Sequence, residues 1–272
     1  MKKEFDTLLV GDVKEKLNEQ EKTYFHRMVE TLKAVGVTIA ELHHGCGGSG
    51  VALVSNEADL ALAKEQNIPV VYYSRECVGG YGADMLLMSF YEVGFSFFQQ
   101  VFDRFHGQPW TILETRRCLL REAVLSDLDV FYEIYAQPSV ARFIEPLSEK
   151  REEELEKLRA YIRMQYPYYG FGTWTILEET TGQIIGRAGL NLSETTGKIQ
   201  LGYLIREEYQ HQGFATEVCQ GILKYAREEL ELRELELEVH PENENSLKLA
   251  KKLGFQPVCR DAMCCILLNI YL

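Results

Sequence analysis

The sequence predicts an α/β protein of two domains, the second of mixed α+β type. The chain of 272 residues is longer than a typical single domain. Short apolar runs alternate with amphipathic stretches in its first half, which is typical of an open sheet of parallel strands. Strand signals restart at Cys118, after a break at Gln108–Pro109. We therefore expect an accessory domain over residues 1–112 and a second domain over residues 113–272.

The composition is typical of a soluble globular protein with an acidic surface. A net charge of −12 argues against sequence-independent nucleic-acid binding, which needs a basic surface, and suits either solubility or a cationic partner. Seven cysteines without a CxxC pair indicate free thiols in a reducing compartment. No apolar run approaches the roughly 18 residues of a membrane span. We therefore expect a cytoplasmic protein with neither a membrane nor a nucleic acid as its partner.

The accessory domain is predicted from hydrophobic periodicity and from the residues that end its elements. Asn67 ends one helix, and Pro69 opens the strand that follows it. The expected strands are 7–10, 37–42, 52–55 and 69–74, and the expected helices are 24–34, 57–66 and about 83–105. Together they make an open sheet of parallel strands.

A glycine-rich run in this domain, Gly45–Gly50, matches the GxGxxG pattern of dinucleotide sites. Such a fingerprint must open a helix, because the pyrophosphate binds to helical amides, whereas this run leads into a strand. We interpret it as a flexible connection. The adjacent His43, His44 and Cys46 lack a distant fourth ligand, so we predict no metal.

Residues 54–73 loosely resemble the late strand–helix–strand segment of HAD-type phosphatases. In that family aspartates at the turn hold magnesium, but Ser55 and Asn56 stand at the turn here. No DxDxT strand precedes the segment, since LLVGDV contains a single aspartate, Asp12. The resemblance therefore implies a scaffold that is not catalytic.

The second domain is predicted to place three successive strands between helical regions. A capping pattern at Ser126 opens its first helix, and Gly254 is a typical residue just beyond the end of its last one. From Cys118 the expected order is strand, two helices, three strands, helix, strand, helix and two strands. The central strands are 172–179, 184–192 and 199–206, a second helix spans about 149–164, and the later elements are a helix from about 214, a strand over 235–239 and a helix over 244–253.

The stretch QHQGFA, Gln210–Ala215, lies where the first of those later helices begins. Gly213 and Ala215 are small, so a ligand can approach the backbone closely. The first amides of a helix have no partner inside the helix and carry the positive end of its dipole. The stretch therefore predicts a phosphate site.

This motif, in this order of elements, resembles the GNAT superfamily of acyl-CoA N-acyltransferases, whose signature at the loop is Q/R-x-x-G-x-G/A. A second motif, Asn243–Ser246 followed by Lys252–Phe255, resembles the RimJ/RimL-type branch. The resemblance covers Cys118–Leu272 and implies acetyl-CoA as cosubstrate without a metal. The strand ending in GYLIR is expected to part from its neighbour and pair with pantetheine amides. The residues assigned to coenzyme A are Leu204, Ile205, Gln210, His211, Gln212, Gly213, Phe214, Ala215, Thr216 and Asn243.

The catalytic residues of the family are only partly matched. Many GNAT enzymes have a tyrosine acid where this chain has Ala250, and the RimJ/RimL-type branch can use a serine at the position of Ser246. Ser246 is expected either to protonate the departing thiolate or to bond within its helix, with Asn243 as an orienting neighbour. The branch often has a glutamate where Gln200 stands. His240 is then a candidate base, and a surface role for it or a water relay are the alternatives.

The acceptor is predicted to be a primary amine, either a protein N-terminus or a small cationic amine. Glu145 lies in the loop where GNAT substrates enter, where it either holds an ammonium ion or is a solvated acid. Tyr203 is also assigned to the substrate. The aromatic run Tyr166–Phe171 either lines the acceptor site or packs in the core. We thus expect an acetyl-CoA-dependent N-acetyltransferase. The alternative is a non-catalytic acyl-CoA-binding sensor or regulatory module, and a homodimer is left open.

Overall fold

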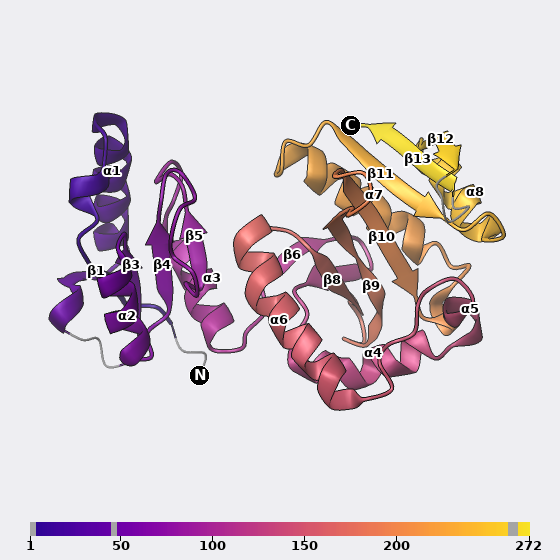
Figure 1. Ribbon diagram of the computed structural model, residues 1–272, viewed down its shortest axis with the longest axis horizontal. Helices are drawn as coiled ribbons and strands as arrows, with labels where there is room; N and C mark the ends of the chain where they lie inside the picture. The colour runs from indigo at the N-terminus through magenta and orange to yellow at the C-terminus, as the bar shows by residue number, and fades with distance from the viewer. Residues whose placement is uncertain (1–3, 45–47, 261–265) are drawn as a thin grey trace. The chain divides into compact units, whose positions relative to one another are not determined.

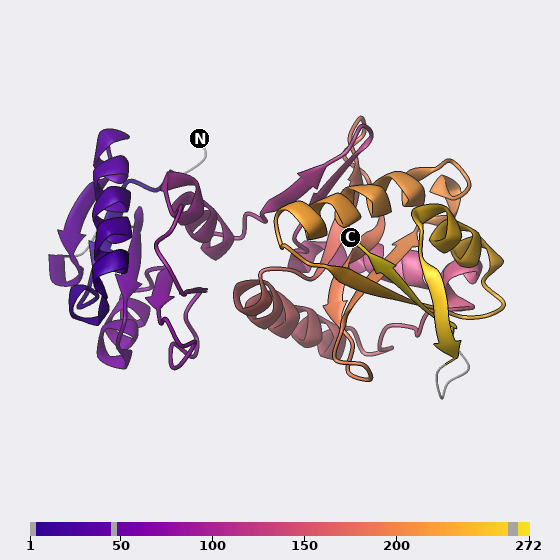
Figure 2. The same ribbon diagram turned by 90° about the horizontal axis from the view of Figure 1, so that it is seen from above.

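The computed structural model describes residues 4–44, 48–260 and 266–272, and Figures 1 and 2 show it from two sides. The chain divides into two compact units, Met1–Trp110 and Thr111–Leu272. We call them the N-terminal unit and the C-terminal unit. The division lies two residues before the predicted boundary at 112. Residues 45–47, which include Cys46 and half of the glycine-rich run, lie outside the described residues.

The N-terminal unit is an open sheet of parallel strands, as the alternating pattern predicts. Its five strands have the order β2-β1-β3-β4-β5, and Figure 1 labels β1, β3, β4 and β5. The strands are β1 Thr7–Val10, β2 Thr38–Glu41, β3 Gly50–Val54, β4 Val70–Tyr73 and β5 Met85–Leu87. The α-helices are α1 Glu19–Ala34, α2 Glu57–Glu65 and α3 Phe95–Phe105. Short 3-10 turns occupy Lys14–Lys16 and Leu42–His44.

Helices cover both faces of this sheet because its strands are apolar on both sides. Side chains alternate along a strand, so Leu8 and Leu9 point to opposite faces. Leu8 belongs to the core that contains residues of α1 and α3, whereas Leu9 belongs to the core that contains residues of α2. The result is a three-layer arrangement typical of parallel sheets.

One predicted element of this unit is wrong. The sequence predicts a single helix over about 83–105, but the structure has strand β5 there, followed by helix α3, with Gly94 as the residue that precedes the helix. Three consecutive apolar residues are too few to show whether the hydrophobic period is that of a strand or of a helix. The sequence therefore predicts β5 and α3 as one helix.

The C-terminal unit is an eight-stranded sheet in the order β12-β13-β11-β10-β9-β8-β7-β6. Its strands are β6 Thr111–Glu114, β7 Cys118–Arg121, β8 Thr173–Glu178, β9 Ile184–Leu192, β10 Ile199–Ile205, β11 Glu234–Val239, β12 Gln256–Arg260 and β13 Ile266–Tyr271. Its α-helices are α4 Leu128–Tyr135, α5 Pro138–Ala141, α6 Arg151–Tyr169, α7 Phe214–Glu228 and α8 Glu244–Leu253, and 3-10 turns lie at Leu125–Asp127 and Glu207–Tyr209. The predicted order from Cys118 is confirmed, with the short helix α5 added between the first two predicted helices.

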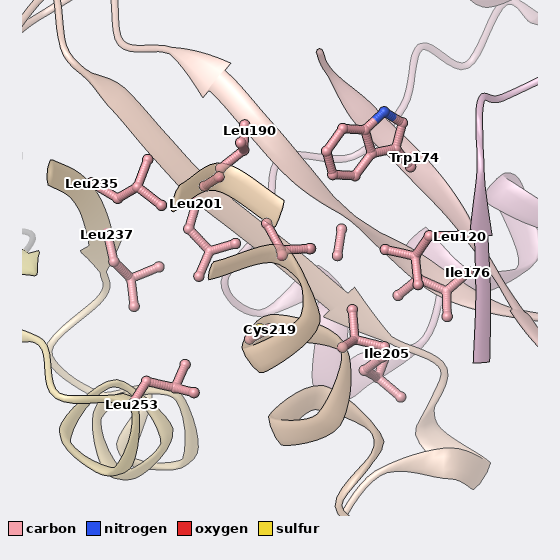
Figure 3. Packing of buried hydrophobic residues seen from close by; sticks show 14 of the residues in the cluster. Leu120, Trp174, Ile176, Leu190, Leu201, Ile205, Cys219, Leu235, Leu237 and Leu253 are labelled. Carbon is pink, nitrogen blue, oxygen red and sulfur yellow. The ribbon is translucent and has the colours of Figure 1, made fainter. Parts of the chain in front are cut away.

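The core of this unit lies between the sheet and helices α7 and α8. Trp174 and Ile176 of β8 pack there with Cys219 of α7 and Leu253 of α8 (Figure 3). Thr175, between the two β8 residues, points to the opposite face and donates a hydrogen bond to Asp127 near the start of α4. Helices α4 and α6 pack together in a separate cluster on that face. The sheet is therefore covered on both sides.

Helix α6 is longer than predicted and takes in most of the aromatic run. Tyr166 is buried in its last turns, where its hydroxyl accepts a hydrogen bond from the Ala123 amide and donates one to the Thr173 carbonyl. Tyr168 and Tyr169 are exposed. The run therefore packs in the core through Tyr166 and Phe171. In the described part of the chain, no helix is long and apolar enough to cross a membrane.

Candidate functional site

The parallel strands β10 and β11 part after one residue pair. Gln200 pairs with Glu236, and the register continues no further. On its other side β10 pairs with β9 over all seven residues. The expected parting is therefore confirmed, and it leaves the β11-facing backbone groups of Leu201–Ile205 free of a strand partner.

A cavity of about 770 Å³ opens beside this gap. We call it the C-terminal cavity. Its walls come from the α5 region (138–144), from β10 and the turn into α7 (203–216), and from the start of α8 and its inward face (243–252). It therefore lies against all the residues that the resemblance assigns to coenzyme A except Gln212.

The turn into α7 is tightly wound. Gly213 immediately precedes the helix in the left-handed region, with φ +84°, and no side chain caps the first amides of α7. His211 is also left-handed, with φ +60°, a conformation that costs energy in a residue with a side chain. Gly213, Phe214, Ala215 and Thr216 line the cavity, so the helix start faces a hollow.

The two glutamines of the motif hold this turn together. Gln210 Nε2 donates to the Ile205 carbonyl at 2.8 Å and to Ser139 Oγ at 3.1 Å. Gln212 Nε2 donates to the Glu208 carbonyl at 2.6 Å, and Gln212 does not line the cavity. The side-chain amide donors of both glutamines are thus used within the protein.

The charge of the cavity wall is opposite to that of the chain as a whole. Arg142, Lys248 and Lys252 line it, and no aspartate or glutamate does among the described residues. Arg142 pairs with Glu242 at 3.0 Å and Lys248 with Glu244 at 3.2 Å, both pairs in exposed positions. These cations were not predicted from the sequence, although the spacing of Lys248 and Lys252 places them on one face of a helix.

Two hydroxyls face each other at the wall formed by β10 and α8. Burial raises the pKa of Tyr203, and the nearby Ser246 hydroxyl lowers it by less, so Tyr203 stays protonated well above neutral pH. Tyr203 Oη is buried, and no atom of the described residues meets the distance and angle of a hydrogen bond to it. Asn243 caps α8, because its Oδ1 accepts from the Ser246 amide at 3.1 Å. The Ser246 hydroxyl is therefore not used in the cap.

Two predicted site residues stand outside the cavity wall. His240 is exposed, lies 5.5 Å from the Phe143 ring between centroids, and accepts at Nδ1 from the Glu242 amide. Glu145 is exposed and follows Ile144, the last lining residue of its segment. The short helix α5 turns the chain so that Phe143 and Ile144 face the cavity. The sequence did not reveal that helix.

Neither a metal cluster nor a reactive thiol is found in the cavity wall. Within the described ranges, no group of three or more His, Cys, Asp or Glu is placed to hold a metal. Cys118 and Cys219 are free and buried. Burial raises the pKa of both thiols, that of Cys118 to about 11, so both stay protonated at neutral pH.

Comparison with known proteins identifies the C-terminal unit. A family model described as an acetyltransferase (GNAT) domain matches residues 117–256. An uncharacterized N-acetyltransferase p20 of Bacillus licheniformis is 30% identical over 150 residues, which cover 53% of this chain and 82% of that protein. The uncharacterized N-acetyltransferase YoaA of Bacillus subtilis is 28% identical over 148 residues, with the same shares covered.

Solved structures show the same fold. An acetyltransferase from Agrobacterium tumefaciens superposes with a TM-score of 0.52 at 22% identity, covering 59% of this chain and 94% of that one. RimL, a ribosomal L7/L12 alpha-N-protein acetyltransferase, superposes with a TM-score of 0.51 at 14% identity, covering 61% and 96%. At such identities the likeness concerns the fold alone.

Proposed function

The chain belongs to the GNAT acetyltransferase family, and on this basis we propose that it transfers the acetyl group of acetyl-CoA to a primary amine. The observation that carries the proposal is the parting of β10 from β11 in front of the start of α7. Free strand backbone suits a ligand that carries amides, and a helix start suits a phosphate. Coenzyme A presents both groups along one molecule.

The C-terminal cavity fits that ligand in charge and in size. The first amides of α7 would take the pyrophosphate, and Lys248, Lys252 and Arg142 would balance the phosphate charge. The backbone of Tyr203–Ile205 would pair with the pantetheine amides. A volume of about 770 Å³ lies within the range of roughly 300–1,000 Å³ that small-molecule sites occupy.

The transfer forms a bond from the amine nitrogen to the thioester carbonyl carbon and breaks the bond from that carbon to sulfur. The departing thiolate takes up a proton. We assign Ser246 as its donor, with the buried Tyr203 hydroxyl beside it as a second proton source. The nitrogen releases its proton to water, since no carboxylate lines the cavity in the described part of the chain.

The acceptor is proposed to be a protein N-terminus or a small cationic amine. The net charge of −12 favours a cationic acceptor. Glu145 stands beside the cavity wall at Ile144, where it can attract an ammonium group. RimL, which has the same fold, is an alpha-N-protein acetyltransferase, and this supports a protein N-terminus as the acceptor.

A product assay with three acceptors tests the proposal. The protein is incubated with acetyl-CoA and either a peptide with a free α-amine, the same peptide with a blocked α-amine and a free lysine, or a linear polyamine. We expect one class to be acetylated, with one coenzyme A released per acetyl group, as mass spectrometry and chromatography would show. Tight acetyl-CoA binding without any acetylated product would instead indicate the non-catalytic acyl-CoA-binding module.

A further inference from the structure

The turn between β6 and β7 lies against the first half of α7. A Cβ added at Gly221 of α7 would lie 3.1 Å from side-chain atoms of Leu113 and of Thr115, so the hairpin packs closely on the helix. Arg117 follows in the same turn, directly before β7. This packing places Arg117 beside the loop that precedes α7.

Arg117 is anchored on Glu217, in the first turn of α7. Its backbone amide donates to Glu217 Oε1 and its Nε to Glu217 Oε2, each at 2.7 Å, while Thr115 Oγ1 donates to Oε1 at 2.8 Å. Burial by itself raises the pKa of Glu217, but the hydrogen bonds from Arg117 and Thr115 outweigh it and lower that pKa. The carboxylate is therefore charged at neutral pH, and hydrogen bonds to it are charge-assisted.

The far end of Arg117 contacts the strained turn before α7. Its Nη1 donates to the Gln212 carbonyl at 3.2 Å, and its guanidinium carbon lies 4.1 Å from the centroid of the Phe214 ring. These two contacts flank Gly213, and the left-handed His211 comes just before them. A non-glycine residue in that conformation persists only where its surroundings fix it.

Arg117 does not line the C-terminal cavity, so it reaches the loop from outside the cavity wall. We infer that Arg117 is a positioning residue: held by Glu217, it fixes residues 211–214 so that the first amides of α7 are preset for a diphosphate. The inference rests on the proposed function, because the diphosphate is that of coenzyme A. A ligand without a diphosphate gains nothing from this arrangement.

Arg117→Met in the full chain tests the inference. We expect the Kd for coenzyme A and the KM for acetyl-CoA to rise about tenfold, with kcat at saturation within about twofold. S-acetylpantetheine lacks the nucleotide diphosphate, so its kcat/KM is expected to be unchanged. Arg116→Met is the matched control, because it removes the same charge from the exposed neighbouring position and should leave the Kd unchanged. If Arg117→Met does not fold, Arg117→Lys keeps the charge without the fork and is expected to weaken coenzyme A binding in the same way.

Glu217→Gln separates positioning from direct contact. If Arg117 acts through the loop, weakening its anchor weakens coenzyme A binding. If Arg117 were itself a phosphate ligand, releasing it from the carboxylate would tighten binding. Tighter binding by Glu217→Gln, an unchanged Kd in Arg117→Met, or an equal loss with S-acetylpantetheine would each overturn the inference. Failure of the wild-type chain to bind coenzyme A would instead contradict the proposed function.

Discussion

The two units each contain a hollow near the carboxyl ends of parallel strands, and the two hollows are similar in size. The C-terminal cavity measures about 770 Å³, and a cavity of about 740 Å³ lies at the ends of β1 and β2. We call the second the N-terminal cavity. Its wall carries both signs of charge: Lys14 and Lys33 with Asp12, Glu30, Glu41 and Asp59. The C-terminal cavity carries three cations and no carboxylate among the described residues.

The backbone differs as well. Strand β1 pairs with a neighbour on each side over four residues, so its backbone groups are used within the sheet. Polar groups at its end are also satisfied, because Asp59 Oδ2 accepts from the Asp12 amide at 2.9 Å and Ser55 Oγ donates to the Asp12 carbonyl at 2.7 Å. Beside the C-terminal cavity, β10 is left with one neighbour. Strand β2, which lines the N-terminal cavity, is also an edge strand with one neighbour. Charge of one sign, together with two parallel strands that part, therefore distinguishes the proposed ligand site more than volume does.

Gly213→Glu is expected to have the largest effect on that site. The substitution forces a side chain onto a left-handed backbone and sets a carboxylate beside the pyrophosphate. Like charges about 4 Å apart near a protein surface repel by several kcal/mol, so coenzyme A affinity in calorimetry should fall more than about 100-fold. Gly182→Glu is the control, since Gly182 is also left-handed and has open space around it. Equal affinity of the two variants for coenzyme A would show that the start of α7 is not part of the coenzyme A site.

Ser246→Ala is expected to lower turnover without loosening binding. Loss of a positioned proton donor reduces kcat by roughly 10²–10⁴-fold. The Kd for coenzyme A should stay within about threefold, because the helix start is untouched. The melting temperature should not change, since Asn243 and not the Ser246 hydroxyl makes the cap. A lower melting temperature with full turnover per folded molecule would assign Ser246 a structural role.

Lys252→Glu tests whether the cations in the wall of the C-terminal cavity attract coenzyme A. We expect coenzyme A affinity to fall about five- to tenfold at low salt, and the loss to shrink at high salt because exposed charges are screened. Lys251→Glu is the matched control, since Lys251 is exposed on the same helix and does not line the cavity. Equal losses in both variants would mean that the overall charge, and not the cavity wall, attracts the ligand.

Asp59→Ala should have the smallest effect on the reaction. It removes the acceptor of the Asp12 amide and of the Asn56 side chain, which should lower the free energy of unfolding by about 0.5–1.5 kcal/mol. Coenzyme A affinity and kcat should be unchanged. A change in either would show that the N-terminal cavity takes part in the reaction.

Local pattern was enough to predict most of the fold, including the helix start to which the phosphate site is assigned. Hydrophobic periodicity and the residues at element ends predict the longer helices and strands, and Gly213 with Ala215 indicates the start of α7. Strands β5 and β6 were missed, because β5 has only three residues and β6 directly follows the Gln108–Pro109 break, so neither carries enough pattern to be separated from helix or linker. Three statements stay predictions: that the N-terminal unit is not catalytic, that the chain can form a homodimer, and that the protein is cytoplasmic.

The finer parts of the site depend on contacts between distant segments, which a sequence pattern does not contain. Arg117 and Gln212 are 95 residues apart in the chain and meet only in the fold. His240 and Glu145 are predicted from their chemistry and from the family's layout, but both are exposed and lie outside the cavity wall. Gln210 and Gln212 match the motif and are assigned to coenzyme A, but their side-chain amides donate to backbone carbonyls and stabilise the turn before α7.

Hydrogen–deuterium exchange of the full chain, with and without coenzyme A, tests most directly whether coenzyme A binds in the C-terminal cavity. The comparison of the two hollows predicts slower exchange at the amides of Tyr203–Ile205 and Phe214–Glu217 when coenzyme A is added. It predicts unchanged exchange at residues 11–14 and 55–59, beside the N-terminal cavity. Slower exchange at those N-terminal residues, with none at the start of α7, would contradict it.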